Sequence, residues 1–155
     1  RKTGTFDFLG FTHLWEKTMK GGWTIKRKTR GKSLRKFMSG IWQWCKKNRH
    51  QETALQCKKL SQKLRGHYNY FAVRGNYKML EVVYEYTRKS WRHWLSRRCS
   101  KGNINWENFM VKVEKHFTLP RPKIKHNFWL MGSKHHTRGT VWGKSSCTDL
   151  WGRPE

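Results

Sequence analysis

Residues 80–94 read Leu-Glu-Val-Val-Tyr-Glu-Tyr-Thr-Arg-Lys-Ser-Trp-Arg-His-Trp, and this stretch shows most clearly how the chain folds. Its large side chains recur in steps of 4, 3, 4 and 3 residues. That spacing places them on one face of an α-helix, which must be buried against another element. The stripe consists of Leu80, Tyr84, Thr87, Trp91 and Trp94. The sequence therefore predicts a packed helix here.

The same period runs through the residues before this helix and predicts two more. The first predicted stripe is Leu34, Phe37, Met38, Ile41 and Cys45, and the second is Cys57, Leu60, Leu64, Tyr68 and Phe71. Gly75-Asn76 is expected to stop the second helix and to cap the next one, because glycine suits a helix end and asparagine suits a helix start.

A fourth helix is predicted after the third, with Asn103 or Asn105 as its N-cap. Its expected buried stripe is Trp106, Phe109, Met110, Val113 and Phe117. The sequence Leu-Pro-Arg-Pro at 119–122 should end it, since proline does not suit a helix interior.

The first thirty residues follow a different period. Residues 5–15 alternate in large apolar side chains, which is typical of a strand, and residues 23–29 alternate again after Gly21-Gly22. We expect a β-hairpin across residues 5–29. The predicted fold is therefore mainly α: a hairpin over residues 1–30, a bundle of three to four helices over 31–131, and a basic tail or truncated region over 132–155. Because the chain opens at Arg1, inside what looks like a strand, we also expect that it comes from a longer protein.

Charge is the strongest functional signal. Lys and Arg number 35 against 9 Asp and Glu, which gives a net charge of +26 and a pI near 10.6. Between Lys17 and Leu80 there are 18 basic residues and one acidic residue, Glu52. A solvated face usually mixes signs, because like charges four residues apart cost roughly a few tenths of a kcal/mol. The pairs Lys59/Lys63 and Arg88/Arg92 have no evident carboxylate, so we expect an external polyanion.

Several other classes of protein fit poorly. Disorder is disfavoured because aromatic residues make up 15% of the chain, including 10 Trp. No apolar stretch has the length of a membrane span, and membrane partners are not expected. The four cysteines lack C-x-x-C spacing, so neither a zinc site nor a disulfide framework is predicted, and the chain is expected to be reduced and intracellular.

Catalytic groups are sparse. The only aspartates are Asp7 and Asp149, far apart in the sequence. Two-metal phosphoryl transfer needs carboxylates that converge on the ions, so no catalytic residue, metal ligand or cofactor is predicted in this chain. Glu81 and Glu85 share a helix face with Arg88 and Lys89 at pairing distance, which favours a structural role.

Aromatic rings are interleaved with the basic residues, and two roles compete for them. Core packing is expected for the rings on the apolar stripes, namely Tyr68, Phe71, Trp91 and Trp94. Stacking or polar contact with RNA is expected for His67, Tyr70 and His93, which fall off or beside those stripes.

Five blocks of this sequence, in order, resemble the end of the palm and the thumb (domain X, or maturase domain) of group II intron-encoded reverse transcriptases. The blocks are Phe6-Asp-Phe-Leu-Gly-Phe-Thr-His13; Leu64-Arg-Gly-His-Tyr-Asn-Tyr-Phe71 with Val73-Arg-Gly-Asn76; Trp91-Arg-His-Trp-Leu-Ser-Arg-Arg98; Ile104-Asn-Trp-Glu-Asn-Phe109; and Leu119-Pro-Arg-Pro-Lys-Ile-Lys-His126. Together they span residues 5–126, most of the chain.

The resemblance implies a part of an RNA-directed DNA polymerase that also helps its intron to splice. It implies a primer grip at Phe8, Leu9 and Gly10, and RNA-facing positions at Arg65, His67, Asn69, Arg74, Arg97 and Arg98. Charge and aromatic pattern add Lys59, Lys63, Tyr70 and Arg92 to the predicted RNA-binding set. The implied partners are intron RNA, a template–primer duplex, and the remaining palm and fingers, in the cytoplasm or an organelle.

The chain also departs from that family. The Tyr-x-Asp-Asp block with the catalytic aspartates is absent, so Mg²⁺ and polymerase activity are expected only in a parent protein. Ala72 stands where a glycine is expected, and no nuclease motif follows residue 131. Two alternatives stay open: a stand-alone basic RNA-binding scaffold, for example a ribosome-associated one, and a degenerate remnant of an intron protein.

Overall fold

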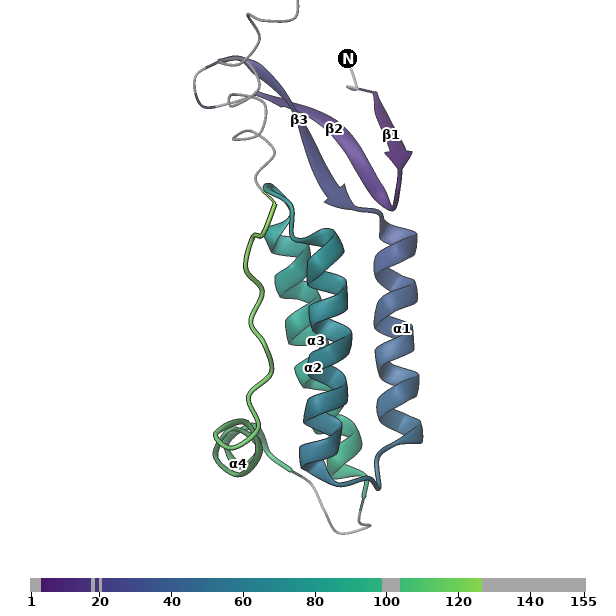
Figure 1. The fold of residues 1–155 in the computed structure, drawn as a ribbon, viewed down its shortest axis with the longest axis vertical. Coiled ribbons are helices and arrows are strands. Elements are labelled where there is room, and N and C mark those ends of the chain that lie inside the picture. Colours follow the sequence, from purple (N-terminus) through teal and green to yellow (C-terminus); the bar gives the residue numbers. More distant parts are fainter. Residues whose placement is uncertain (1–3, 18, 20, 99–103, 127–155) are drawn as a thin grey trace, which may run out of the picture. The chain divides into compact units, whose positions relative to one another are not determined.

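The computed structural model describes residues 4–17, 19, 21–98 and 104–126. The elements within these residues are β1 (Thr5–Phe8), β2 (Phe11–Lys17), β3 (Trp23–Thr29), α1 (Gly31–Lys47), α2 (Thr53–Phe71), α3 (Tyr77–Ser96), α4 (Trp106–Phe109) and η1 (Met110–Glu114). All of them belong to one compact unit, Arg1–Lys125. The described part is mainly helical, with a small antiparallel sheet beyond one end of the helices (Figure 1).

The sheet differs from the predicted hairpin. It has three strands in the order β1-β2-β3, because the expected first strand is broken at Leu9-Gly10. Both residues have positive φ, 47° and 79°, which reverses the chain so that Phe6 pairs with His13. Leu9 carries a side chain in the left-handed region, a conformation that is uncommon for a residue other than glycine.

One face of this sheet is rich in large apolar side chains. Strand residues alternate between faces, and the register aligns Phe6 with His13 and Trp15 with Ile25. The exposed apolar residues on that face are Phe6, Phe8, Trp15, Trp23 and Ile25. Phe11 lies on the same face but is buried, because it meets Phe71 of α2 with the two rings 5.1 Å apart.

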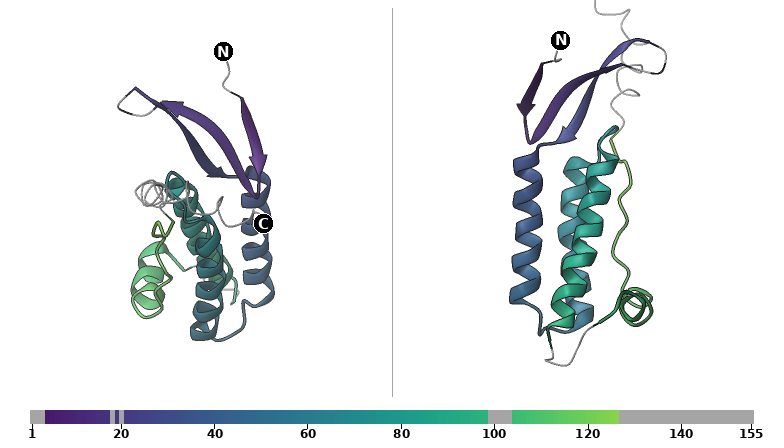
Figure 2. Two further views of the ribbon diagram at one scale, coloured as in Figure 1. Left: turned by 45° about the horizontal axis from the view of Figure 1, so that its top comes forward. Right: turned by 180° about the vertical axis from the view of Figure 1, so that it is seen from behind.

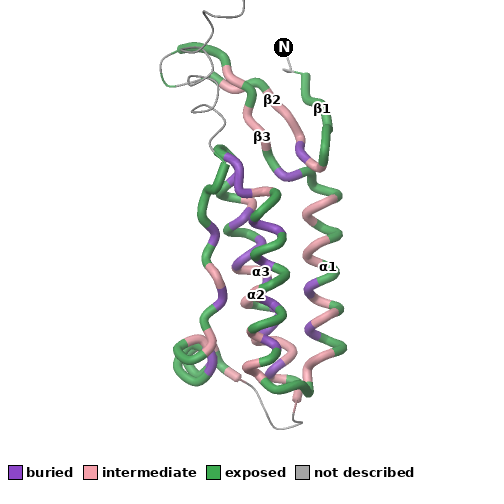
Figure 3. The backbone as a smooth tube through the Cα atoms, in the orientation of Figure 1, coloured by how far each residue is buried: buried purple, intermediate pink, exposed green. Residues whose placement is uncertain are grey.

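The helices α1, α2 and α3 lie side by side, and most residues of the predicted stripes are buried or packed against the core (Figures 1 and 2). Met38 of the first stripe is only partly buried and lies outside that core. Figure 3 shows that burial follows the inward faces of α2 and α3. The centre of the core is formed by Ile41, Cys45, Leu60, Leu64, Tyr68, Leu80, Val83, Tyr84, Trp91 and Leu95. Trp94 and Phe71 are partly buried and pack against it, so core packing is confirmed for all four rings assigned to it.

Two buried amides tie the helices and the sheet together. Gln56 donates to the carbonyl of Asn48 at 2.6 Å and accepts from Trp91 Nε1 at 2.8 Å. Asn76 precedes α3 as expected, but its side chain makes no cap hydrogen bond. Its Oδ1 instead accepts from the Thr29 amide and its Nδ2 donates to Thr29 Oγ1, both at 2.8 Å. Asn76 therefore joins the sheet to the bundle.

The predicted fourth helix is shorter and less regular than expected. Asn105 is its cap, and the Asn105 side chain accepts from the Trp106 amide at 2.7 Å. The helix α4 then passes into the π-helix η1, in which Val113 is buried but Met110 is exposed, contrary to the predicted stripe. The extended segment that follows reaches back to the end of α2, where the Lys125 amide donates to the Ala72 carbonyl. The predicted tail, 132–155, lies outside the described residues.

Candidate nucleic-acid interface

Six of the ten predicted RNA-binding residues lie on α2. Its buried face packs into the core through Leu60, Leu64 and Tyr68. The helix has no acidic residue along its length. Its exposed side therefore presents only basic and neutral groups: Lys58, Lys59, Gln62, Lys63, Arg65, Asn69 and Tyr70.

Five of the predicted RNA contacts are exposed cations. They are Lys59, Lys63, Arg65, Arg74 and Arg97. None of them forms an ion pair with another residue that the structure describes. Lys63 Nζ lies 5.8 Å from the ring of Trp44, a cation–π contact that leaves the charge at the surface. These side chains can contact phosphates without first breaking an ion pair.

Two other predicted contacts, Arg92 and Arg98, have structural roles instead. Arg98 donates to the carbonyls of Arg49 and Gln51, and so holds the loop between α1 and α2. Burial lowers the pKa of Arg98. Arg92 donates to the Ile104 carbonyl at 3.0 Å and lies 4.6 Å from the Trp106 ring. Each guanidinium group donates to at least one backbone carbonyl that the sequence could not place beside it.

His67 is buried rather than exposed, which corrects its predicted position beside the apolar stripe. Only 6% of its surface is accessible. Its ring stacks on Phe37, with centroids 4.2 Å apart, and also contacts Phe71 at 4.6 Å. Burial lowers the pKa of His67 to about 4, so the imidazole is neutral at pH 7 and is not a cationic phosphate contact.

Asn69 and Tyr70 are exposed, and each also links α2 to another segment. Lys125 Nζ donates to Asn69 Oδ1 at 2.6 Å. Tyr70 donates its hydroxyl to the Leu9 carbonyl at 2.7 Å, and its ring stacks on Phe11 with centroids 5.7 Å apart. The Tyr70 ring is half exposed. The third aromatic candidate, His93, is partly buried and stacks on Trp42.

The predicted primer-grip residues form the turn between β1 and β2. Phe8 and Leu9 are exposed, and Gly10 adopts positive φ. A Cβ at Gly10 would approach the Phe71 ring at 3.5 Å. The turn is therefore held against the end of α2, with two apolar side chains at the surface.

The expectation that Arg88 lacks a carboxylate is wrong. Arg88 donates to both oxygens of Glu114 at 2.6 Å and to Glu85 at 3.0 Å. The hydrogen bond to Glu114 raises the pKa of Arg88. The pairing with Glu85 on the same helix was predicted, whereas Glu114 comes from η1 and had no signal in the sequence.

The small and polar residues of α1 that face α2 gave no recognisable signal in the sequence. Ser33, Lys36 and Gly40 line a groove together with His67 and Lys63. No periodic signal could have identified them, because they are small or polar and their role depends on which helix lies opposite.

Three further features concern metal ligands, cysteines and membrane-spanning helices. The described residues contain no group of three His, Cys, Asp or Glu side chains that could hold a metal ion. In the same part of the chain, Cys45 and Cys57 are free thiols. No helix there is both long and apolar enough to cross a membrane.

Compared with known proteins, the chain matches no family model, no curated protein and no solved structure.

Proposed function

We propose that this chain is the RNA-binding thumb, or maturase segment, of a group II intron reverse transcriptase. In this role it clamps intron RNA and the template–primer duplex. The five sequence blocks over residues 5–126 motivate the proposal. The polymerase aspartates and their Mg²⁺ would belong to the palm of the parent protein, because this chain has only two aspartates, Asp7 and Asp149.

The observation that carries the proposal is contact between two of these blocks. Residues 6–13 and 64–71 are far apart in sequence, yet Tyr70 donates to the Leu9 carbonyl and Phe11 meets Phe71. A turn with exposed Phe8 and Leu9 thus lies against the C-terminal end of α2. A primer grip and a duplex-binding helix would need this proximity, since both contact the same duplex.

Charge supports RNA as the partner. The exposed cations Lys59, Lys63 and Arg65 lie on a helix without carboxylates. Phosphate contacts of this kind supply affinity that falls as salt rises, because binding releases counterions. The half-exposed Tyr70 ring beside them offers a stacking surface for an unpaired base.

The experiment is a binding series with the whole chain. Affinity for a structured group II intron RNA is compared with affinity for an unrelated duplex RNA across salt concentrations. The proposal expects tighter binding to the intron, with the preference surviving at higher salt. If the chain binds both RNAs equally, and both lose binding at the same salt concentration, the proposal is wrong. That result would favour the stand-alone basic scaffold.

Two double variants that remove the same charge test whether RNA binds at α2 and Arg97. Replacing Arg65 and Arg97 with Ala should weaken intron binding and reduce the salt slope by about 2, since each lost phosphate contact lowers it by about 1. The control replaces Lys112 and Lys115, two exposed cations in and just after η1, which removes the same charge elsewhere. If both double variants lose affinity equally, the assignment of the clamp to α2 and Arg97 fails.

A further inference from the structure

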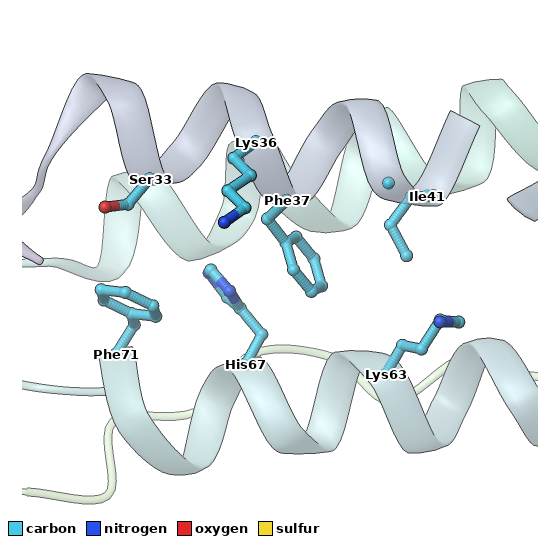
Figure 4. A pocket seen from close by; sticks show the side chains of 8 residues that line it. Ser33, Lys36, Phe37, Ile41, Lys63, His67 and Phe71 are labelled. Atoms are coloured by element: carbon cyan, nitrogen blue, oxygen red, sulfur yellow. The ribbon is translucent and has the colours of Figure 1, made fainter. Parts of the chain in front are cut away.

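A groove of about 460 Å³ lies between α1 and α2 (Figure 4). Its size falls within the range of small-molecule sites, which is roughly 300–1,000 Å³. The lining includes Lys36, Phe37 and Gly40 from α1, and Lys63, His67 and Phe71 from α2. The floor of the groove is therefore mostly apolar, and each of the two helices contributes one lysine at its rim, Lys36 from α1 and Lys63 from α2.

The floor is built from stacked rings. Phe37, His67 and Phe71 follow one another with centroids 4.2 and 4.6 Å apart and interplanar angles near 30°. All three are partly or fully buried, so the column is fixed by the packing of both helices. The two Phe rings cover the faces of His67, so the groove meets the edge of its ring. A flat aromatic ligand can pack against such an edge, because aromatic pairs also favour edge-to-face contact.

His67 brings one unsatisfied polar atom to this floor. Its Nε2 is buried and has no hydrogen-bond partner among the residues that the structure describes. Buried polar atoms are normally paired, so an unpaired one needs an explanation. The ring is neutral, and a neutral imidazole nitrogen donates or accepts according to its tautomer. The edge of a nucleobase presents both donors and acceptors, and so can pair with either form.

The edge of the groove carries positive charge. Figure 4 shows Lys36 extending from α1 toward His67, and Lys63 rising from α2 on the other side of Phe37. Both lysines are exposed, and neither α1 nor α2 contains an acidic residue. An apolar floor below two ammonium groups that form no ion pair with the described residues matches a ligand that combines a flat ring with a phosphate.

We propose that this groove binds one unstacked nucleotide of an RNA, with its base against the ring column and its phosphate near Lys36 and Lys63. The proposal rests on the RNA-binding function proposed above, and it adds a site for an unpaired base to a surface that otherwise contacts phosphates.

Two glycines supply a matched pair of variants. A Cβ added at Gly40 would meet nothing within 4 Å, and the same is true at Gly66 on α2. Gly40 lines the groove, whereas Gly66 does not. Gly40→Leu should therefore direct a larger side chain into the groove from an unobstructed Cβ, and Gly66→Leu makes the same change of helix propensity outside it.

The probes are AMP, ribose 5-phosphate, and a five-nucleotide oligo(A) with or without an abasic central position. Binding is followed by the NMR signals of the His67 ring. We expect saturable shifts with AMP in the wild type and in Gly66→Leu, and at least ten-fold weaker binding in Gly40→Leu. The oligomer should bind more tightly than AMP, and the abasic oligomer should lose most of that affinity.

Other outcomes overturn the proposal in distinct ways. Equal shifts with ribose 5-phosphate mean an anion contact without a base site, and equal AMP affinity in the two Leu variants places the nucleotide elsewhere. Tighter binding of AMP than of the oligomer means a free nucleotide and not RNA. If the groove binds nothing while the chain still prefers intron RNA, only the groove proposal fails. If AMP binds but intron preference is absent, the proposed function fails.

Discussion

The sheet and the helical bundle use the same residue types in opposite ways. Trp23 in β3 is 57% exposed, whereas Trp91 in α3 is 1% exposed. The bundle buries its rings because each helix faces another helix. The sheet is a single layer, and among the described residues Phe11 is the one aromatic side chain of its apolar face with a ring contact to α2. Large aromatic side chains therefore mark a core only where a second layer covers them.

The largest loss of stability is expected when a buried tryptophan of the bundle is replaced with Ala. The same replacement in the sheet should cost much less. Trp91→Ala should lower the free energy of unfolding by about 3–5 kcal/mol, because it leaves a cavity in the core. It also removes the partner of Gln56 Oε1. Trp23→Ala should cost less than about 1 kcal/mol. Urea denaturation measures both, and Trp91→Phe serves if the Ala variant does not fold. Equal losses at the two positions would contradict the comparison.

The second largest loss of stability is expected at Asn76, which connects the sheet to the bundle. Asn76→Ala removes two hydrogen bonds to Thr29 and one to the Phe71 carbonyl, all at 2.8 Å. We expect a loss of about 3 kcal/mol, because the Thr29 amide is left buried without a partner. The Thr29 amide should also exchange with solvent faster. Asn69→Ala, at an exposed position on α2, is the control. Unchanged protection at Thr29 would mean that the joint lies elsewhere.

Between pH 5 and pH 7, a pH dependence of stability is expected from His67 in the bundle. The pKa of His67 is lowered to about 4 from an ordinary 6.5, so between these values the unfolded chain binds a proton that the folded chain does not. Stability should therefore fall as pH falls through this window, by about 2 kcal/mol between pH 7 and pH 5. The His67→Phe variant should lack this part of the slope. Parallel curves for the two proteins would exclude His67 as the cause.

The smallest change in stability is expected when the arginine of an ion pair is replaced with lysine, and two such pairs can be compared. Arg88–Glu114 is largely buried, with side chains 15% and 16% exposed, whereas Arg30–Asp7 beside the sheet is 44% and 40% exposed. Arg88→Lys should cost about 1 kcal/mol, since lysine cannot bind both Glu114 oxygens as the guanidinium does. Arg30→Lys should change stability by less than about 0.5 kcal/mol. A larger loss at Arg30 would reverse the ranking of the two regions.

The helical stripes were predictable because burial on a helix repeats along the sequence. Leu64, Tyr68 and Trp91 are buried as their spacing indicated. The cap at Asn105 was also predictable, since it depends on the amide of the next residue. Each of these features depends on neighbours within a few turns of the chain.

The features that the sequence did not predict depend instead on contacts with distant parts of the chain. The break at Leu9 places a leucine at φ 47°, which residue type alone does not favour. His67 follows the outer face of α2 in sequence, but α1 covers it. Arg98 looked like a free cation, yet its guanidinium binds carbonyls of residues 49 and 51. In each case the deciding contact comes from a distant segment.

The sequence by itself determined the period of each helix, the excess of positive charge and the blocks that suggest an RNA partner. These are properties of composition and local spacing. Tertiary structure alone decided which cations are free, as Arg65 is, and which are occupied, as Arg98 is. It also decided that α1 and α2 enclose a groove over His67. The physical reason is that desolvation and hydrogen bonding depend on what lies opposite a side chain, and a linear pattern does not contain that information.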